Sequence, residues 1–262
     1  NQAEVFEKIA NQTLGTADTW ESNLSGGEDK KESFERLLKE NKLGYMALLR
    51  NLRNMNQAGV NEDLVKEKIK QRKGAEKVLP FRFVAAARHA PNFEKELDQA
   101  LVANIEKEQH LEGKTIVLVD ISGSMWGNLS LKSDINRMDA AATLGSVIPS
   151  ENLRVFSFTT KTVEVPARKG MAGVDAILNS QPHGMTNLGE AVDYVNSIYH
   201  DRLIVITDEQ SQTKVPDPVV NKAYMVNVAS NGNGVGYEKW HHIDGFSESV
   251  IKYIQQYEHE FH

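Results

Sequence analysis

Hydrophobic positions follow two different periods along the chain, and the change falls near residue 110. Before it, apolar residues recur every three or four positions, as on the buried face of an amphipathic helix; Phe34, Leu37 and Leu38 are an example. From Lys114 onward, short apolar runs rich in β-branched residues alternate with helix-like segments. The pattern predicts an all-α segment followed by an α/β part with a mostly parallel sheet covered on both faces.

The first part of the chain reads as helices of about three turns with short links, which is typical of helical repeats. Asp18 and Asn61 are expected N-caps, and Pro80 and Pro91 are expected at helix starts. A break is expected at residues 25–27. The sequence predicts helices at 5–12, 19–24, 28–41, 45–55, 62–73, 80–90 and 91–109.

The second part alternates strands and helices. Strands are expected at 114–119, 153–158, 162–166, 203–208 and 223–228, with a short edge strand at 241–244. Helices are expected at 135–148, begun by Asp134 and stopped by Pro149, and at 174–180, 187–199 and 246–257. The glycines of 231–236 lie in a predicted surface loop, because their spacing differs from G-x-G-x-x-G.

Polar residues follow the first strand of this part directly. The run Lys114–Val119 is apolar without alternation, as in a strand buried on both faces. Asp120, Ser122 and Ser124 come next, with a glycine between the serines. Small oxygen donors at the carboxyl end of a central strand lie where open α/β sheets bind ligands, and such donors suit a hard cation.

This Asp-x-Ser-x-Ser sequence after a buried strand resembles the metal-ion-dependent adhesion site of von Willebrand factor A domains. The resemblance implies a threonine and a second aspartate from later loops, and Thr186 and Asp208 match them. It implies one divalent cation, Mg²⁺ or another hard ion such as Mn²⁺ or Ca²⁺. The hydroxyls of Ser122, Ser124 and Thr186 would bind it directly, and Asp120 and Asp208 largely through water.

Each of these residues also has a plainer interpretation. The serines and Thr186 suit helix capping, and an aspartate at a strand end is common. If the ion binds, it either captures an acidic side chain of a partner protein or only ties three loops together. Trp126, just after the serines, either shapes the rim of the site or packs on a neighbouring loop.

Composition narrows the class of protein. The chain has 262 residues, 40% hydrophobic and 25% charged, with a net charge of −6 and no cysteine. This is ordinary for a globular protein, and the apolar runs are too short for a membrane span. The absence of cysteine excludes disulfides and thiolate metal sites and fits a reducing compartment, so we expect a cytoplasmic protein.

Charge is distributed unevenly along the chain. Residues 30–88 hold 15 Lys and Arg against 7 Asp and Glu, whereas residues 114–262 hold 12 against 17. Basic side chains crowd the end of the first stretch, and phosphate binding by such residues tolerates many sequences. The expected RNA-binding residues are Lys66, Lys68, Lys70, Arg72, Lys73, Lys77, Arg82 and Arg88. A solvated basic face is the alternative.

A second resemblance covers nearly the whole chain. Residues 18–55, 77–90 and 245–257 are similar to the last helices of Ro autoantigen proteins, in which a TROVE ring of helical, HEAT-like repeats precedes a von Willebrand A domain. The resemblance implies two domains, a TROVE remnant at 1–110 and a von Willebrand A domain at 114–262, in a ribonucleoprotein of noncoding RNA. Most of the ring is missing, so we expect either a fragment or a natural short form.

The sequence argues against catalysis. It has neither a Walker lysine motif nor G-x-S-x-G, and it nominates no general base for a metal-dependent hydrolase. The histidines at 241, 242, 259 and 262 are expected to be solvated. The favoured function is Ro-type RNA binding with a metal-dependent docking site. The alternative is a protein-interaction module that uses the metal site, with the helical part only a scaffold that binds no RNA.

Overall fold

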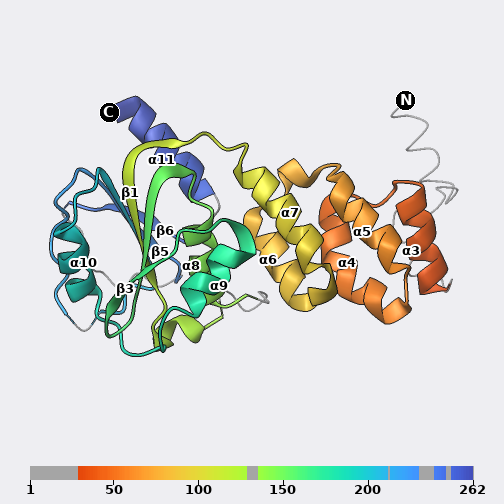
Figure 1. The fold of residues 1–262 in the computed structure, drawn as a ribbon, viewed down its shortest axis with the longest axis horizontal. Coiled ribbons are helices and arrows are strands. Elements are labelled where there is room, and N and C mark those ends of the chain that lie inside the picture. The colour runs from red at the N-terminus through yellow and green to blue at the C-terminus, as the bar shows by residue number, and fades with distance from the viewer. Residues whose placement is uncertain (1–28, 129–134, 212, 230–238, 246–248, 262) are drawn as a thin grey trace, which may run out of the picture.

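The computed structural model describes residues 29–128, 135–211, 213–229, 239–245 and 249–261 (Figure 1). The helices expected at 5–12 and 19–24, the break at 25–27 and the loop at 231–236 lie outside these ranges.

The first described part is helical, as predicted, and lies beside the sheet-containing part in Figure 1. Asn61 caps its helix as expected, since its side chain accepts a hydrogen bond of 3.0 Å from the amide of Leu64. The helix predicted at 91–109 is shorter at both ends: Pro91–Phe93 form a 3₁₀ turn, and the α-helix that follows ends at Ile105. The helices are α3 (Lys30–Lys39), α4 (Tyr45–Ala58), α5 (Glu62–Gln71), α6 (Pro80–His89) and α7 (Glu94–Ile105), with 3₁₀ turns η1 (Ala75–Lys77) and η2 (Pro91–Phe93).

The second part is built on one six-stranded sheet with the order β3-β2-β1-β4-β5-β6. Neighbouring strands are parallel except β3, which runs antiparallel to β2 at one edge. The predicted fold class, a mostly parallel α/β sheet preceded by a helical segment, is confirmed. The strands are β1 (Leu111–Asp120), β2 (Ser150–Phe158), β3 (Thr162–Val165), β4 (Arg202–Thr207), β5 (Lys222–Asn227) and β6 (His241–Asp244).

Helices cover both faces of this sheet. On one face, Val117 and Val119 of β1 share an apolar cluster with α8 (Arg137–Ser146), α9 (Gly170–Leu178) and α11 (Ser249–Phe261). On the other face, Ile116 and Leu118 pack in a cluster with α10 (Leu188–Asn196). The central strand is therefore buried on both sides, which explains its unbroken apolar sequence.

The predicted start of α8 at Asp134 is wrong. The helix begins at Arg137, because the side chain of Asn136 accepts a hydrogen bond of 2.7 Å from the amide of Asp139 and so caps it. It ends at Ser146, before the predicted stop at Pro149. Asn136 lies two residues after Asp134, and both side chains can cap a helix. The apolar pattern alone did not show which of the two is the cap.

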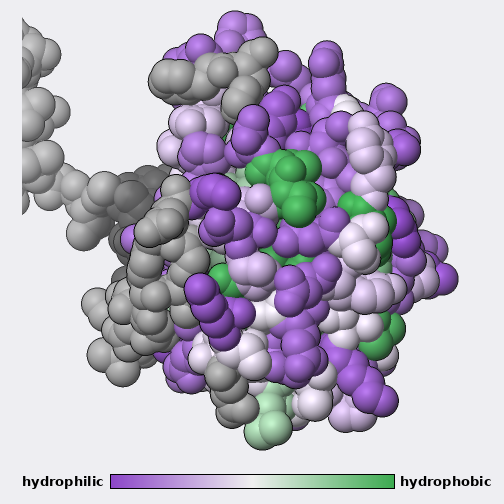
Figure 2. Space-filling model, turned by 90° about the vertical axis from the view of Figure 1, so that its left-hand side faces the viewer, coloured by the Kyte–Doolittle hydropathy of each residue, from purple (hydrophilic) through white to green (hydrophobic). Residues whose placement is uncertain are grey.

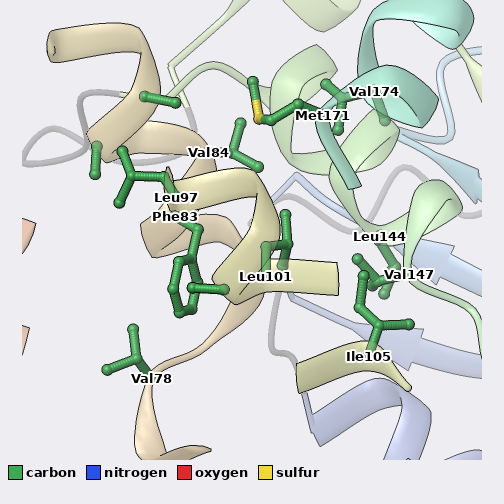
Figure 3. Packing of buried hydrophobic residues seen from close by; sticks show 14 of the residues in the cluster. Val78, Phe83, Val84, Leu97, Leu101, Ile105, Leu144, Val147, Met171 and Val174 are labelled. Carbon is green, nitrogen blue, oxygen red and sulfur yellow. The ribbon is translucent and has the colours of Figure 1, made fainter. Parts of the chain in front are cut away.

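One apolar cluster continues from the helical segment into the sheet part. Figure 3 shows Leu101 and Ile105 of α7 on the side facing Leu144 and Val147, and all four belong to the same cluster of buried residues. Polar contacts accompany it: Arg88 forms an ion pair of 2.8 Å with Asp175. The helical segment therefore packs directly against the α8 and α9 side of the sheet part.

A buried ion pair fixes the last helix to the sheet. The guanidinium of Arg202, 1% exposed, donates hydrogen bonds to both carboxylate oxygens of Glu258 on α11. Its Nη1 also donates to the Thr115 hydroxyl at 2.8 Å, and Lys222 lies 3.0 Å from Glu258. Burial acts to raise the pKa of Glu258, but the hydrogen bonds from Arg202 and Lys222 outweigh it and hold that pKa below its ordinary value.

The outer surface on the α10 side is mostly hydrophilic, and its hydrophobic side chains form small separate spots (Figure 2). Among the described helices, none has the length and apolar character needed to cross a membrane.

We expect Arg202→Ala to lower the free energy of unfolding by about 3–5 kcal/mol, because it leaves the Glu258 carboxylate largely buried without its main counter-charge. Urea denaturation followed by circular dichroism measures this. Arg154→Ala is the matched control, since its ion pair with Glu164 is about half exposed, and it should cost less than about 1 kcal/mol. Equal losses in the two variants would contradict the expectation.

Candidate functional site

The carboxyl end of β1 carries the first of the predicted metal ligands. Asp120 is fully buried, and its carboxylate accepts hydrogen bonds from the Ser122 amide at 2.9 Å and the Thr207 hydroxyl at 2.7 Å. Burial raises the pKa of Asp120 to about 7, and the nearby charge of Asp208 adds to the increase. A cation beside this carboxylate would favour its charged form.

Three hydroxyl groups meet next to Asp120. The Ser122 oxygen lies 3.1 Å from that of Ser124 and 2.8 Å from that of Thr186, which donates to it. The loop before α10 carries Thr186 and is held to the serine loop by a backbone hydrogen bond of 2.9 Å from Gly123 to Gly184. Residues 64 positions apart are thus brought into direct contact.

Asp208 follows β4, the neighbour of β1, and is fully buried. Its carboxylate lies 3.7 Å from the guanidinium of Arg137 and accepts a hydrogen bond of 3.2 Å from the Gln210 amide. Val119 of β1 lies opposite Ile206 of β4, so Asp120 and Asp208 lie at the ends of neighbouring strands. The five residues named from the sequence therefore converge at one edge of the sheet.

The donor set fits magnesium by geometry. Adjacent oxygens around an octahedral Mg²⁺ ion with bonds of about 2.0–2.1 Å lie about 3 Å apart. The Ser122 hydroxyl oxygen lies at 3.1 Å from that of Ser124 and 2.8 Å from that of Thr186, which is close to this spacing. The residues are all oxygen donors, which hard cations prefer. The same hydroxyls also form hydrogen bonds with one another.

A hollow of about 310 Å³ opens above these hydroxyls. Ser124 and Thr186 lie in its wall with Met185 and Gln210. Beside the serines, Trp126 is 57% exposed and makes an edge contact with the ring of His183, whose centroid lies 5.4 Å away. Trp126 therefore packs on the neighbouring loop, as one interpretation expected, and its exposed part faces solvent beside the serines.

The predicted RNA-binding residues differ in their surroundings. Lys66 pairs with Glu62, Lys70 with Glu96, and Arg88 with Asp175. Lys68 donates to the side chains of Asn41 and Gln71, and Arg72 donates to Asn104. Lys73 and Lys77 are exposed. Carboxylate groups of the protein therefore compete with phosphate for Lys66, Lys70 and Arg88, three of the expected RNA-binding residues.

Arg82 has a different environment. It lines a hollow of about 240 Å³ between α4 and α6, together with Arg50 and Arg53. Within the described part of the chain, these three arginines make no ion pair with a carboxylate. We call this the arginine hollow; its wall also includes Asn54 and the exposed His89.

The expected RNA-binding residues did not include Arg50 and Arg53, although the charge count did, because the two arginines lie a full helix before the basic run. Their spacing of three residues on a helix was the available signal, since such residues share a face. The expectation that His242 is solvated is wrong, because its side chain is 17% exposed and its Nδ1 atom lies 3.1 Å from the Oε1 atom of Glu209. The sequence analysis did not name Glu209. Among the other histidines, His259 is exposed on α11 and His262 lies outside the described residues.

Comparisons with known proteins agree with this architecture. A model of the TROVE domain matches residues 12–150, which extends past the helical segment into the sheet part. A search of curated proteins finds no match. Among solved structures, the Ro (RSR) protein of Deinococcus radiodurans is similar, with a TM-score of 0.62 at 15% sequence identity. The similarity covers 97% of this chain and 66% of that one.

Proposed function

The chain belongs to the TROVE domain family, as its resemblance to Ro autoantigen proteins suggested, and from this premise we propose that it binds noncoding RNA without catalysis, as a cytoplasmic ribonucleoprotein. The observation that carries the proposal is the arginine hollow. Three guanidinium groups around one depression attract a polyanion, and the described residues give them no carboxylate partner.

The chemistry of the hollow suits RNA. Arginine binds phosphate through two parallel hydrogen bonds, and Asn54 adds a side-chain amide. Apart from His89, the remaining wall is apolar and includes Met46 and Phe81, over whose ring Arg82 lies at 4.6 Å. A nucleotide offers a phosphate to the arginines and a flat base to such a wall.

The lysines of α5 contribute less in this proposal. Lys66 and Lys70 already have carboxylate partners, so binding RNA would require them to exchange one anion for another. The exposed Lys73 and Lys77 remain available in the segment that follows that helix. The alternative, a protein-interaction module with an inert helical scaffold, does not explain why the arginine hollow has its charges uncompensated within the described residues.

A second function is favoured by the contact of three hydroxyls. We propose that Ser122, Ser124 and Thr186 hold one Mg²⁺ ion directly, while Asp120 and Asp208 act largely through water. The support is the convergence of these residues from three loops, and the match of the hydroxyl spacing to an octahedral ion.

The role of this site would be to dock an acidic side chain of a partner protein. When bound through neutral hydroxyls, Mg²⁺ supplies unbalanced positive charge and an exchangeable water position. The hollow above Ser124 and Thr186 leaves room for a carboxylate, and the exposed Trp126 and Met185 flank the approach with apolar surface. A purely structural ion that ties the three loops together is the competing role.

RNA binding through the arginine hollow predicts that Arg50→Glu combined with Arg53→Glu weakens affinity for a structured RNA at least about tenfold and lowers the salt slope by about 1.5–2, as expected for two lost phosphate contacts. Filter binding at several salt concentrations measures both. Lys30→Glu with Lys31→Glu on α3 is the control with the same charge change. No binding by the wild type at low salt, or equal loss in both variants, would favour the scaffold alternative.

Mg²⁺ binding predicts a saturable heat in titration calorimetry of the wild type with Mg²⁺ or Mn²⁺, and loss of that heat in Asp120→Ala. Removing this carboxylate takes away a fully buried acidic group that is hydrogen-bonded to the backbone of Ser122. Asp193→Ala, a change at an exposed position of α10, is the control. Equal binding by Asp120→Ala and the wild type would refute the site.

Docking predicts that Thr186→Ala abolishes Mg²⁺-dependent capture of a carboxylate-bearing peptide and changes the melting temperature by only a few degrees. The reason is that one hydroxyl ligand is lost while the two buried aspartates remain. Fluorescence anisotropy with an acidic peptide and its amide analogue measures capture. A large fall in melting temperature with capture intact would indicate a structural ion instead.

A further inference from the structure

A second group of metal-ligating side chains lies at the carboxyl edge of the sheet, apart from the hydroxyl cluster. Glu209 follows β4, and His242 and Asp244 belong to the edge strand β6. One ligand atom from each of the three lies within 4.8 Å of the others. The geometry points to a transition-metal site, suited to Zn²⁺, formed by Glu209, His242 and Asp244.

The spacing is close to that of a coordinated ion. Ligand atoms around a tetrahedral Zn²⁺ with bonds of about 2.0–2.1 Å lie about 3.4 Å apart. The Nδ1 atom of His242 and the Oε1 atom of Glu209 are already 3.1 Å apart. Asp244 is exposed, so its side chain can close the remaining distance by rotating about its own bonds.

The donor set distinguishes this site from the hydroxyl cluster. An imidazole nitrogen with two carboxylates suits Zn²⁺ and similar transition metals, whereas Mg²⁺ and Ca²⁺ prefer oxygen donors alone. With three protein ligands, a fourth position is open to water or to a partner's side chain. The two sites would therefore select different ions although Asp208 and Glu209 are adjacent in sequence.

The burial of Glu209 supports a cation here. Its side chain is 1% exposed, and that of His242 is 17% exposed. A buried carboxylate is costly unless a positive charge accompanies it. His242 supplies such a charge only when protonated, while a metal bound by neutral imidazole supplies it throughout the neutral range.

A site here would also hold the edge of the sheet. The edge strand β6 pairs with β5 over only four residues, from Tyr224 to Asn227. Glu209 comes from the loop after β4, on the far side of β5. A metal bound by all three residues would therefore link the short edge strand to the centre of the sheet. The competing possibility is a plain ion pair between Glu209 and His242.

The test uses Co²⁺ as a spectroscopic substitute for Zn²⁺ on the whole 262-residue chain, with Mg²⁺ in excess to occupy the hydroxyl cluster. We expect a visible absorption band that saturates at one equivalent and disappears when Zn²⁺ is added. His242→Ala should weaken Co²⁺ binding at least about tenfold. His259→Ala, at an exposed position on α11, should bind like the wild type.

Two further variants keep the result interpretable. Asp244→Asn removes an exposed ligand with little effect on folding, and it should weaken Co²⁺ binding even if His242→Ala proves unstable. Asp120→Ala should keep the Co²⁺ band, because it belongs to the other cluster. Absence of a band in the wild type, or an unchanged band in a folded His242→Ala or Asp244→Asn, would overturn the site in favour of the ion pair.

Discussion

The central strand β1 imposes the main constraint on this structure. It is parallel to β2 on one side and β4 on the other, and helices bury both of its faces. Parallel neighbours require crossover connections: the one from β1 to β2 runs through α8 on one face, and α10 on the other face leads into β4, so the loops after β1 and β4 meet at one edge. Asp120 and Asp208 end up together for this reason alone. The position of the site is thus a consequence of topology, and its chemistry depends on which residues those loops carry.

Burial makes the residues at this edge interdependent. The Asp120 carboxylate is tolerated in the interior because a backbone amide and the Thr207 hydroxyl both donate to it. The serine loop is in turn fixed against the Thr186 loop by Gly123. A comparable arrangement supports α11, where Arg202 saturates Glu258. In both places a buried polar group requires hydrogen-bond partners and so fixes which loop or helix packs beside it. Burial of apolar side chains provides most of the stabilisation.

The sequence predicted much of this and failed in specific ways. The apolar run before Asp120 was enough to predict the sheet, and the resemblance to the metal-ion-dependent adhesion site was needed to place Thr186 beside the serines. The start of α8 was misplaced because capping by Asn136 is a local hydrogen bond that hydrophobic periodicity does not contain. The partners of Lys70 and Arg88 were unpredictable, since they lie on other helices and depend on packing. The contact between Glu209 and His242 was unpredictable as well, because it depends on how the loop after β4 packs beside the edge strand β6.

The number of basic residues in a stretch is therefore a poorer guide to anion binding than the ion pairs that these residues form. The basic stretch of the helical segment looks like a continuous cationic surface in sequence, yet Lys66, Lys70 and Arg88 each lie beside a carboxylate. The arginines that could meet an external anion are instead those whose helix faces turn toward the hollow between α4 and α6. At the carboxyl edge of the sheet the excess charge is negative, because the buried carboxylates of Asp120, Asp208 and Glu209 outnumber the cationic side chains beside them. If both ends bind what their charges favour, the anion and the cations occupy different parts of one molecule. The packing of α6 and α7 against α8 and α9 connects these parts.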